Sequence, residues 1–534
     1  MLPVLLQQVR RDRIILPIWV LGTAALLAVS AASVVNEYGD AEGRSQILTV
    51  ALATPALLSL RGIPNGDSLG SAVHFQSYAF LAVTIGLMNV FLATRHGRAD
   101  EEKGRRELLL ATPVSRLTPA VATLVLAVVA NAVFAVLAAL GYLAAGLPAD
   151  GAVLSATALA VTGLAFFGVG MLAGELTATT RAASGIGVVL VLVAYALRAA
   201  GDALGTPDVA KLTLEPAWPS WLSPIGWGQQ TFAFTDDIWW PVAAIGALAV
   251  VLVGVALVVH SRRELGASLL AERRGRAAAR PTLRGAFGLA WRLHWPTLLA
   301  WTLGSALLGL GLGSLITAVS QLDFADNPQL AAILQSLGHT DQSDAAAALI
   351  PALMVIVGSM AAAAGVQAVL RAREEEAAGR AEILLASPVS RIGWLLAFTA
   401  LGVVTVAVVL LATGLASAAG FAASGSDEFV WQSLGQCLVQ APAALAFVAV
   451  TALVVGLLPR AAIGLGWGLF GAGVVIGYFG QVLQLPDWLL KASPITHVPE
   501  VPVDDWVPTL VVTAIAVVLA ALGMAAFRRR DLTT

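Results

Sequence analysis

Long apolar runs separated by short polar segments occupy nearly the whole chain. A helix needs about 20 mostly apolar residues to cross the hydrocarbon core of a membrane. Twelve stretches fit that length, so the pattern predicts an all-α integral membrane protein with twelve transmembrane helices. The first stretch lacks a small-residue cleavage site, which indicates a retained span and not a signal peptide. The predicted spans are residues 14–36, 72–94, 117–145, 151–174, 182–201, 241–260, 296–319, 345–370, 392–423, 434–458, 461–483 and 508–527.

The composition agrees with a membrane protein. Of the 534 residues, 58% are hydrophobic and 12% are charged, whereas about 25% are charged in an average soluble domain. These values exclude a soluble globular protein and a disordered chain. The net charge of −2 gives no general signal for nucleic-acid binding. A single cysteine, Cys437, excludes an internal disulfide and a cysteine-based metal site.

The basic residues orient the predicted spans. With the N-terminus inside, most of the 31 lysines and arginines fall in inner segments, as the positive-inside rule describes for cytosolic loops. An even number of spans then places both the N-terminus and the C-terminus in the cytosol. Arginine far outnumbers lysine, and alanine, valine, leucine and glycine are abundant, which is typical of a GC-rich bacterial genome. The predicted location is therefore the bacterial plasma membrane.

A repeat divides the chain into two halves. Residues 98–116 read RADEEKGRRELLLATPVSR, and residues 373–391 read REEEAAGRAEILLASPVSR. Six predicted spans per half give both halves the same orientation, so they are parallel repeats about an axis along the membrane normal. The predicted domains are a first six-span repeat at 1–260, a basic cytosolic linker with an interfacial helix at 261–294, and a second six-span repeat at 295–534.

Each repeated segment predicts a helical hairpin that projects into the cytosol. Its charged helix ends in apolar residues, 108–111 or 383–386, and a proline then breaks the helix. In the first half, Ser115 or Thr118 is predicted to cap the next helix. An exposed apolar tip suggests a docking surface, and the near-copy in the other half favours this over a merely solvated turn. The candidate docking residues are Gly104, Arg105, Glu107, Leu109, Leu110, Pro113, Ser115, Arg116, Gly379, Arg380, Glu382, Leu384, Leu385, Pro388, Ser390 and Arg391.

Both hairpins resemble a known family pattern. ABC transporter permeases of the type-two class carry acid-x-x-Gly-x-x-Glu-x-Leu-Leu-x-x-Pro-x-Ser-Arg after their second span. Both segments fit this pattern, although Arg105 and Arg380 stand where the family commonly has threonine. Residues 219–225 and 486–495 also look like the family's outer Pro-x-Trp-Leu stretch. The fused twelve-span form is similar to actinobacterial polyketide-antibiotic and multidrug exporters.

The resemblance implies a permease subunit that extrudes hydrophobic or amphipathic drugs or antibiotics, with two copies of a soluble ABC ATPase docked on the hairpins. ATP and magnesium would be bound by that partner, and this chain would bind no cofactor. The residues agree independently, because a nucleotide-binding loop needs lysine followed by serine or threonine. The chain has three lysines, Lys103, Lys211 and Lys491, and none of them is followed by serine or threonine. The chain is therefore predicted to be a transport subunit and not an enzyme.

The resemblance also implies that the second, fifth, eighth and eleventh spans line a substrate path between the halves. Their aromatic and methionine side chains suit varied apolar cargo, although helix packing and lipid contact remain the alternative use of any one of them. The candidate path residues are Phe75, Tyr78, Phe80, Met88, Asn89, Phe91, Tyr195, Met354, Met360, Gln367, Trp467, Phe470, Tyr478 and Phe479.

Two alternatives stay open at this point. A proton-coupled secondary multidrug exporter also has two parallel six-span halves. It usually needs an intramembrane acid, and none lies near the centre of a predicted span. An ABC exporter of a lipid shares every sequence feature named so far. Transport by the purified chain on a proton gradient would indicate the first alternative, and unchanged drug sensitivity of expressing cells would favour the second.

Overall fold

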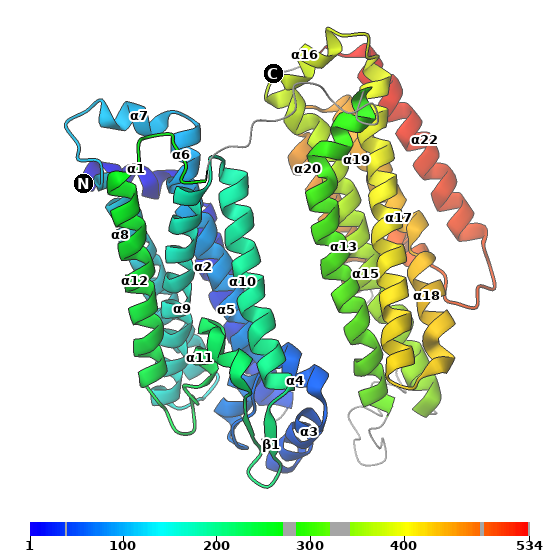
Figure 1. Ribbon diagram of the computed structural model, residues 1–534. Coiled ribbons are helices and arrows are strands. Elements are labelled where there is room, and N and C mark those ends of the chain that lie inside the picture. The colour runs from blue at the N-terminus through cyan, green and yellow to red at the C-terminus, as the bar shows by residue number, and fades with distance from the viewer. Residues whose placement is uncertain (38–39, 271–284, 321–341, 481–484, 532–534) are drawn as a thin grey trace. The chain divides into compact units, whose positions relative to one another are not determined.

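The chain divides into two compact units, Met1–Gly275 and Arg276–Thr534. In the computed structural model, the described parts of both units are almost wholly helical (Figure 1). The described residues are 1–37, 40–270, 285–320, 342–480 and 485–531.

The first unit is a bundle of long helices around two central ones. α5 (Leu69–His96) and α9 (Ala149–Leu176) pack against each other and are mostly buried. Small residues allow this contact, since a side chain at Gly170 would come within 2.9 Å of the Cβ of Ala93. Close packing through small residues is typical of membrane helices. The surrounding helices are α2 (Ile15–Glu37), α8 (Thr118–Ala144), α10 (Thr180–Ala203) and α12 (Trp240–Arg262).

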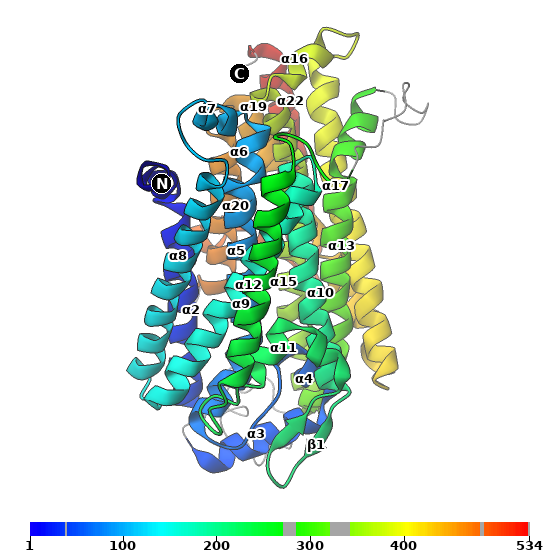
Figure 2. The ribbon, with the colours of Figure 1, turned by 60° about the vertical axis from the view of Figure 1, so that its left-hand side comes forward.

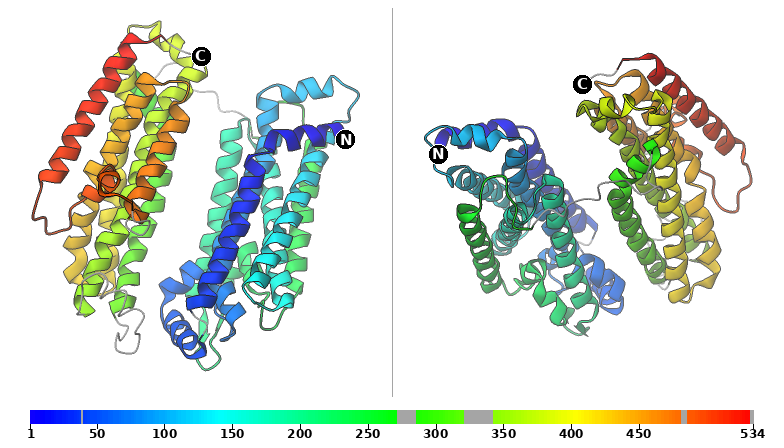
Figure 3. Two further views of the ribbon diagram at one scale, coloured as in Figure 1. Left: turned by 180° about the vertical axis from the view of Figure 1, so that it is seen from behind. Right: turned by 45° about the horizontal axis from the view of Figure 1, so that its top comes forward.

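Short elements close both ends of this bundle. One end, which we call the hairpin end, carries α1 (Leu2–Asp12), α6 (Arg98–Glu102) and α7 (Arg105–Leu110). Figure 3 shows α1 running across the bundle beside the start of α2. The opposite end of the first unit carries a group of short helices and a two-stranded antiparallel sheet (Figure 2). These elements are α3 (Ala41–Ala53), α4 (Pro55–Arg61), β1 (Thr206–Asp208), β2 (Thr213–Glu215), η1 (Trp218–Leu222) and α11 (Pro224–Gln229).

α1 is amphipathic. Its buried residues Val4, Gln8 and Asp12 recur every four positions, which is one face of a helix, and the helix packs on α8. The opposite face exposes Leu2 and Val9. A short helix with an exposed apolar face and flanking arginines is typical of one lying in the membrane interface.

A buried ion pair fixes the opposite end of the first unit. Arg198 and Asp202 lie one turn apart on α10, 3.2 Å from each other, and both side chains are fully buried. Arg198 also donates to the carbonyl of Ser59 in α4 at 2.5 Å, and Asp202 accepts from the hydroxyl of Ser220 in η1 at 3.0 Å. Because each charge has these additional partners, the pair ties α4 and η1 to α10.

The second unit is built on the same plan. α15 (Gln342–Ala377) packs between α17 (Arg391–Ala423) and α19 (Ala441–Leu457), and α13 (Gly285–Ser320) lies along α17. A hairpin again follows the central helix, with α16 (Arg380–Leu385) at its tip. The remaining elements are η4 (Asp427–Phe429), α18 (Val430–Leu438), α20 (Ala462–Phe479), α21 (Asp487–Leu490), η5 (Pro494–His497) and α22 (Val507–Arg529).

The described residues contain eleven helices long and apolar enough to cross a membrane, so the count of twelve stays a prediction. The predicted span 461–483 corresponds to α20, whose apolar part, Ala462–Tyr478, is shorter, and residues 481–484 lie outside the description. Residues 285–294, predicted as an interfacial helix, are the first turns of the continuous helix α13. Residues 261 and 262 of the predicted linker belong to α12, and residues 271–284 are not described.

Candidate functional site

The two hairpins have the same backbone geometry. Gly104 and Gly379 precede the tip helices with φ values of 66° and 72°. This left-handed conformation is easily adopted by glycine alone. The turns after the helices also match, because the amides of Val114 and Val389 each donate to a carbonyl two residues earlier at 2.7 Å. The repeated sequence therefore produces a repeated structure.

The surfaces of the two hairpins match as well. Residues 104–115 and 379–390 have the same order of buried, half-buried and exposed positions. Every exposed position in this stretch carries an identical or closely similar side chain. The two hairpins differ in side-chain chemistry where Arg106 of the first corresponds to Ala381 of the second, and both of these positions are buried. A partner that recognises one tip would therefore find the same surface on the other.

The most exposed apolar side chains of the tips are Leu108 and Ile383, at 74% and 77%. Both lie in the apolar tips that the sequence predicts, although neither is in the list of candidate docking residues. Periodicity within the short helices could have identified them, because the neighbouring leucine pairs turn inward and are half-buried. The candidates Glu107 and Glu382 are exposed. Neither carboxylate forms an ion pair with another described residue of the chain. Both are therefore available to pair with a partner protein.

The remaining hairpin candidates hold the turns. Ser390 caps α17 by accepting from the amide of Gly393 at 3.0 Å. The expectation that Ser115 or Thr118 caps the next helix in the first unit is wrong, because their hydroxyls bond each other at 2.8 Å and α8 has no side-chain cap. Pro113 and Pro388 are exposed. Arg391 donates to the carbonyl of Arg530 at 2.6 Å, and Arg116 is half-buried.

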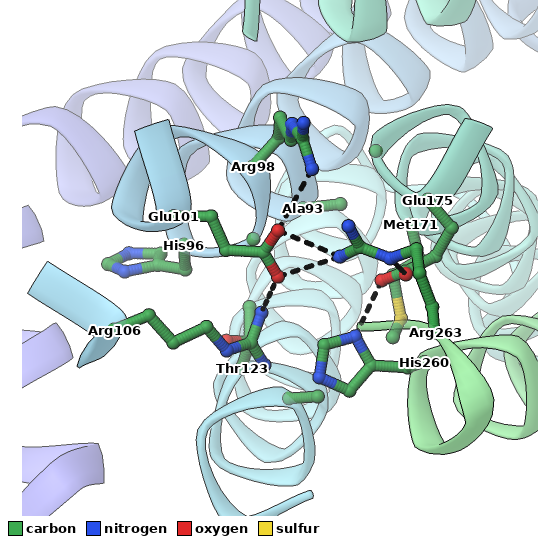
Figure 4. A pocket seen from close by; sticks show the side chains of 13 residues that line it. Ala93, His96, Arg98, Glu101, Arg106, Thr123, Met171, Glu175, His260 and Arg263 are labelled. Carbon is green, nitrogen blue, oxygen red and sulfur yellow. Dashed lines mark hydrogen bonds and ion pairs between the residues drawn. The ribbon is translucent and has the colours of Figure 1, made fainter. Parts of the chain in front are cut away.

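A buried carboxylate anchors the first hairpin to the bundle. Glu101 accepts from Arg98 at 2.9 Å, from Arg106 at 2.8 Å and from Arg263 at 2.8 Å (Figure 4). Arg263 follows the last helix of the unit, and its side chain and that of Glu101 are 4% and 2% exposed. Burial alone would lower the pKa of Arg263, but its two carboxylate partners raise that pKa by more than burial lowers it. Because the pKa is raised overall, Arg263 stays positively charged.

Arg263 also reaches α9. Its Nε donates to Glu175 at 2.5 Å, and Nδ1 of His260 lies 2.7 Å from the other oxygen of the same carboxylate (Figure 4). The hairpin, the end of α9 and the end of α12 thus share one buried network.

The second unit has an ion pair equivalent to Glu101–Arg263, but the residues around it differ. Glu376 accepts from Arg530, which follows the last helix, at 2.5 and 2.7 Å. Arg530 lies over the ring of Phe527, 4.5 Å from its centroid, a favourable cation–π contact. We call Glu101–Arg263 and Glu376–Arg530 the hairpin clamps. Sequence reasoning missed them, although Glu101 and Glu376 are separated by the same offset as the rest of the repeat.

A second group of charges ties α1 to α5 and to the first hairpin, where Arg11 of α1 pairs with Asp100. Arg105, a predicted docking residue, pairs with Asp100 at 3.2 Å, just as Arg380 pairs with Glu375 at 2.6 Å in the second unit. Asp12 of α1 accepts from Arg95 and His96, both at 2.7 Å. Burial alone would raise the pKa of Asp12, but these two partners outweigh it and hold that pKa below its usual value.

The candidate path residues fall into three groups by exposure. Phe75, Tyr78, Met88, Asn89 and Met354 are buried within their own units, whereas Phe80, Phe91 and Trp467 are exposed on a unit's surface. Tyr195, Met360, Gln367, Phe470 and Tyr478 are half-buried, and the side chain of Phe479 lies outside the description.

The polar members of this set are hydrogen-bonded inside their units. Asn89 and Asn131 exchange amide hydrogen bonds of 3.1 and 2.8 Å between α5 and α8. Gln367 accepts from the indole of Trp301 at 2.8 Å. Tyr195 donates to the carbonyl of Leu60 at 2.6 Å. Such bonds join neighbouring membrane helices, so these side chains support the walls of each unit in this structure.

Comparison with known proteins agrees with this architecture. The family model described as "Multidrug efflux system permease Rv1217c, C-terminal domain" matches residues 5–260 and again residues 283–528. The chain is also 35% identical over 527 residues to the Multidrug efflux system permease protein Rv1217c of Mycobacterium tuberculosis (strain ATCC 25618 / H37Rv). The alignment covers 98% of this chain and 93% of that protein.

These matches confirm the predicted helical, two-repeat membrane architecture, since one model describes each half in turn. With its many apolar helices, the protein is a multi-pass protein of the bacterial plasma membrane. Its family also makes it a transport subunit. The chain therefore belongs to the Rv1217c family of multidrug efflux system permeases.

Proposed function

We propose that this chain is the transmembrane permease subunit of an ATP-driven exporter of hydrophobic or amphipathic drugs. The observation that carries the proposal is the pair of matched hairpins. Each presents one highly exposed apolar residue, Leu108 or Ile383, and one exposed glutamate beside it. Exposed apolar groups rimmed by charge are typical of protein interaction sites. Each hairpin is also fixed to its own unit by its clamp. A hairpin that passes movement from an ATPase to the membrane helices has to be fixed in this way.

Two equal docking surfaces favour two copies of one soluble ABC ATPase. Because no nucleotide-binding loop is present in this sequence, ATP and magnesium belong on that partner. The hairpin end then faces the cytosol. Closure of the two ATPase subunits would move the hairpins, and the clamps would carry this movement to the last helix of each unit through Arg263 and Arg530.

The cargo is argued from the exposed candidate residues. Phe80, Phe91 and Trp467 are large aromatic side chains that the packing of their own units leaves exposed. Aromatic and apolar surfaces with few polar groups suit varied hydrophobic molecules. The relative's printed function, multidrug efflux, agrees with such a cargo. Export of a lipid would use the same surfaces.

Reconstitution tests the proposal. The purified chain is placed in proteoliposomes with its ATPase, and transport of a fluorescent hydrophobic cation is followed. We expect transport that requires ATP and stops with a hydrolysis-deficient ATPase, while a proton gradient without the ATPase moves nothing. Transport driven by the gradient alone would contradict the proposal and indicate a secondary exporter. ATP-dependent movement of a labelled phospholipid, with no movement of the dye, would replace the drug by a lipid.

A further inference from the structure

A partly open pocket lies between α2 and α5 of the first unit, close to the hairpin end. Its volume is about 150 Å³. A protein cavity of about this size accommodates one benzene ring. The pocket therefore has room for one ring of a larger molecule whose remainder stays outside. Its lining residues are Asp12, Ile15, Leu16, Trp19, Met88, Phe91, Leu92 and Arg95.

The apolar part of the pocket carries two aromatic rings and a thioether. The ring centroids of Trp19 and Phe91 are 6.3 Å apart, with the rings tilted by 46°. Phe91 is 38% exposed and Trp19 is half-buried, so packing within the unit leaves part of both rings uncovered. Aromatic rings attract a further ring beyond the effect of burial, and the flexible side chain of Met88 adapts to it. These contacts favour an aromatic ligand over an acyl chain, which gains burial alone.

The polar end of the pocket offers a hydrogen-bond donor. Asp12 and Arg95 close this end, 2.7 Å apart, and their side chains are 3% and 32% exposed. Within the described residues, Arg95 makes one hydrogen bond, from Nη1 to Asp12. A guanidinium has five N–H groups and accepts none. Arg95 therefore keeps donors for an oxygen atom of a ligand, while Asp12 is engaged by Arg95 and His96.

The position of the two ends suits an amphipathic molecule at a membrane surface. Met88 and Arg95 are seven positions apart on α5, which corresponds to about 10 Å along a helix. With the hairpin end facing the cytosol, Arg95 lies at the membrane interface and Met88 lies deeper in the inner leaflet. Molecules with an apolar ring and a polar group are favoured at this depth, where one end is apolar and the other is wet.

The second unit lacks the residues that shape this pocket. The repeat places Ala363, Val366 and Leu370 where the first unit has its methionine, phenylalanine and arginine, and all three are buried. Trp301, the counterpart of the tryptophan in the pocket, donates its indole N–H to Gln367 at 2.8 Å. The second unit therefore offers neither the ring walls nor the donor, and the chain contains its own comparison site.

We propose that this pocket binds the aromatic ring of a cargo molecule that carries a hydrogen-bond-accepting oxygen, at the depth of the inner leaflet. The ring lies against Trp19, Met88 and Phe91, and the oxygen accepts from Arg95. That the ligand is cargo rests on the export function proposed above, whereas the binding itself requires no ATPase.

Photolabelling of the purified full chain in lipid nanodiscs tests the proposal. The probe is a phenyl trifluoromethyl diazirine with a carboxamide on its ring; light releases nitrogen from it, and the resulting carbene inserts into nearby C–H bonds. Peptide mass spectrometry should find saturable labelling within residues 15–19 and 88–92, and none at the matching residues 297–301 and 363–367. A probe with isopropyl in place of the carboxamide keeps the shape without the acceptor, and it should bind about tenfold more weakly, as the loss of one hydrogen bond to a charged group implies.

Three variants locate the ligand. Leu16→Trp fills the pocket and should abolish labelling of residues 88–92. Leu26→Trp is the matched control, because Leu26 lies on the same helix, is 42% exposed and is outside the pocket; it should be labelled as the unmodified chain is. Phe91→Ala removes a ring at a partly exposed position and should weaken labelling up to about tenfold, which provides a second test that leaves the core intact.

Labelling that is absent from the pocket, or equal for the two probes, would overturn the proposal and leave the pocket to the acyl chains of lipids. Undiminished labelling of a folded Leu16→Trp variant would also overturn it. Reconstituted transport separates this site from the export function. Labelling of the pocket without ATP-dependent transport would remove the export function and keep the binding site, whereas transport without labelling would keep export and remove the site.

Discussion

Replacing Leu108 and Ile383 by aspartate in one chain is expected to weaken ATPase binding strongly and to impair ATP-driven export while the fold survives. The two side chains are 74% and 77% exposed, so the units do not need them for packing. Burying a leucine in an interface contributes about 1.5–3 kcal/mol, and a charge at that place would add a desolvation cost. We expect affinity for the ATPase to fall about 10- to 100-fold at each hairpin, measured by pull-down and by ATP-dependent dye transport.

Leu270→Asp provides the matched control for this variant. Leu270 is also an exposed apolar residue, 57% accessible, near the hairpin end of the first unit but outside the hairpin. This change should leave ATPase binding unaltered. Full binding and export by the chain with both tip substitutions would show that the hairpins are solvated turns and that the ATPase docks elsewhere.

Glu101→Gln is expected to destabilise the first unit strongly. The carboxylate is 2% exposed and accepts from three arginines. Glutamine keeps the shape and removes the charge, which takes away the carboxylate that pairs with Arg98 and Arg106 and leaves Arg263 with Glu175. Breaking a buried ion pair by removing one partner costs about 3–5 kcal/mol. We expect a clearly lower unfolding temperature in detergent and faster proteolysis within residues 98–116, even without the ATPase.

The matched control is Glu107→Gln, six residues further along the same hairpin. Glu107 is exposed, and isolated exposed charges contribute about 0–1 kcal/mol. Its loss should leave the unfolding temperature unchanged and affect only coupling to the ATPase. Equal stability of Glu101→Gln and the unmodified chain would contradict the role given to the clamp.

Features that depend on local sequence could be predicted. Apolar runs of membrane-spanning length give the helical class directly, because composition decides whether a segment is stable in lipid. The copies at 98–116 and 373–391 identify the repeat and the two hairpins. The left-handed turns at Gly104 and Gly379 were not predicted: they divide what the pattern predicts as one charged helix, and both glycines were expected only as docking residues.

Features that depend on distant partners could not be predicted. Glu101 and Arg263 are 162 positions apart, and Glu376 and Arg530 are 154 apart. No periodicity links residues so far apart, so the clamps become visible only when the bundle brings the ends of helices together. The same applies to Asn89, which reads as a polar residue facing a path but lies fully buried against Asn131.

The central claim is that each of the two hairpins seats one ATPase subunit. Native mass measurement of the complex purified after co-expression tests it most directly. The account predicts one permease chain with two copies of the ATPase, and one copy when either Leu108→Asp or Ile383→Asp is present alone. A stable assembly with a single ATPase at saturating concentration, or two copies still bound to the chain with both substitutions, would contradict it.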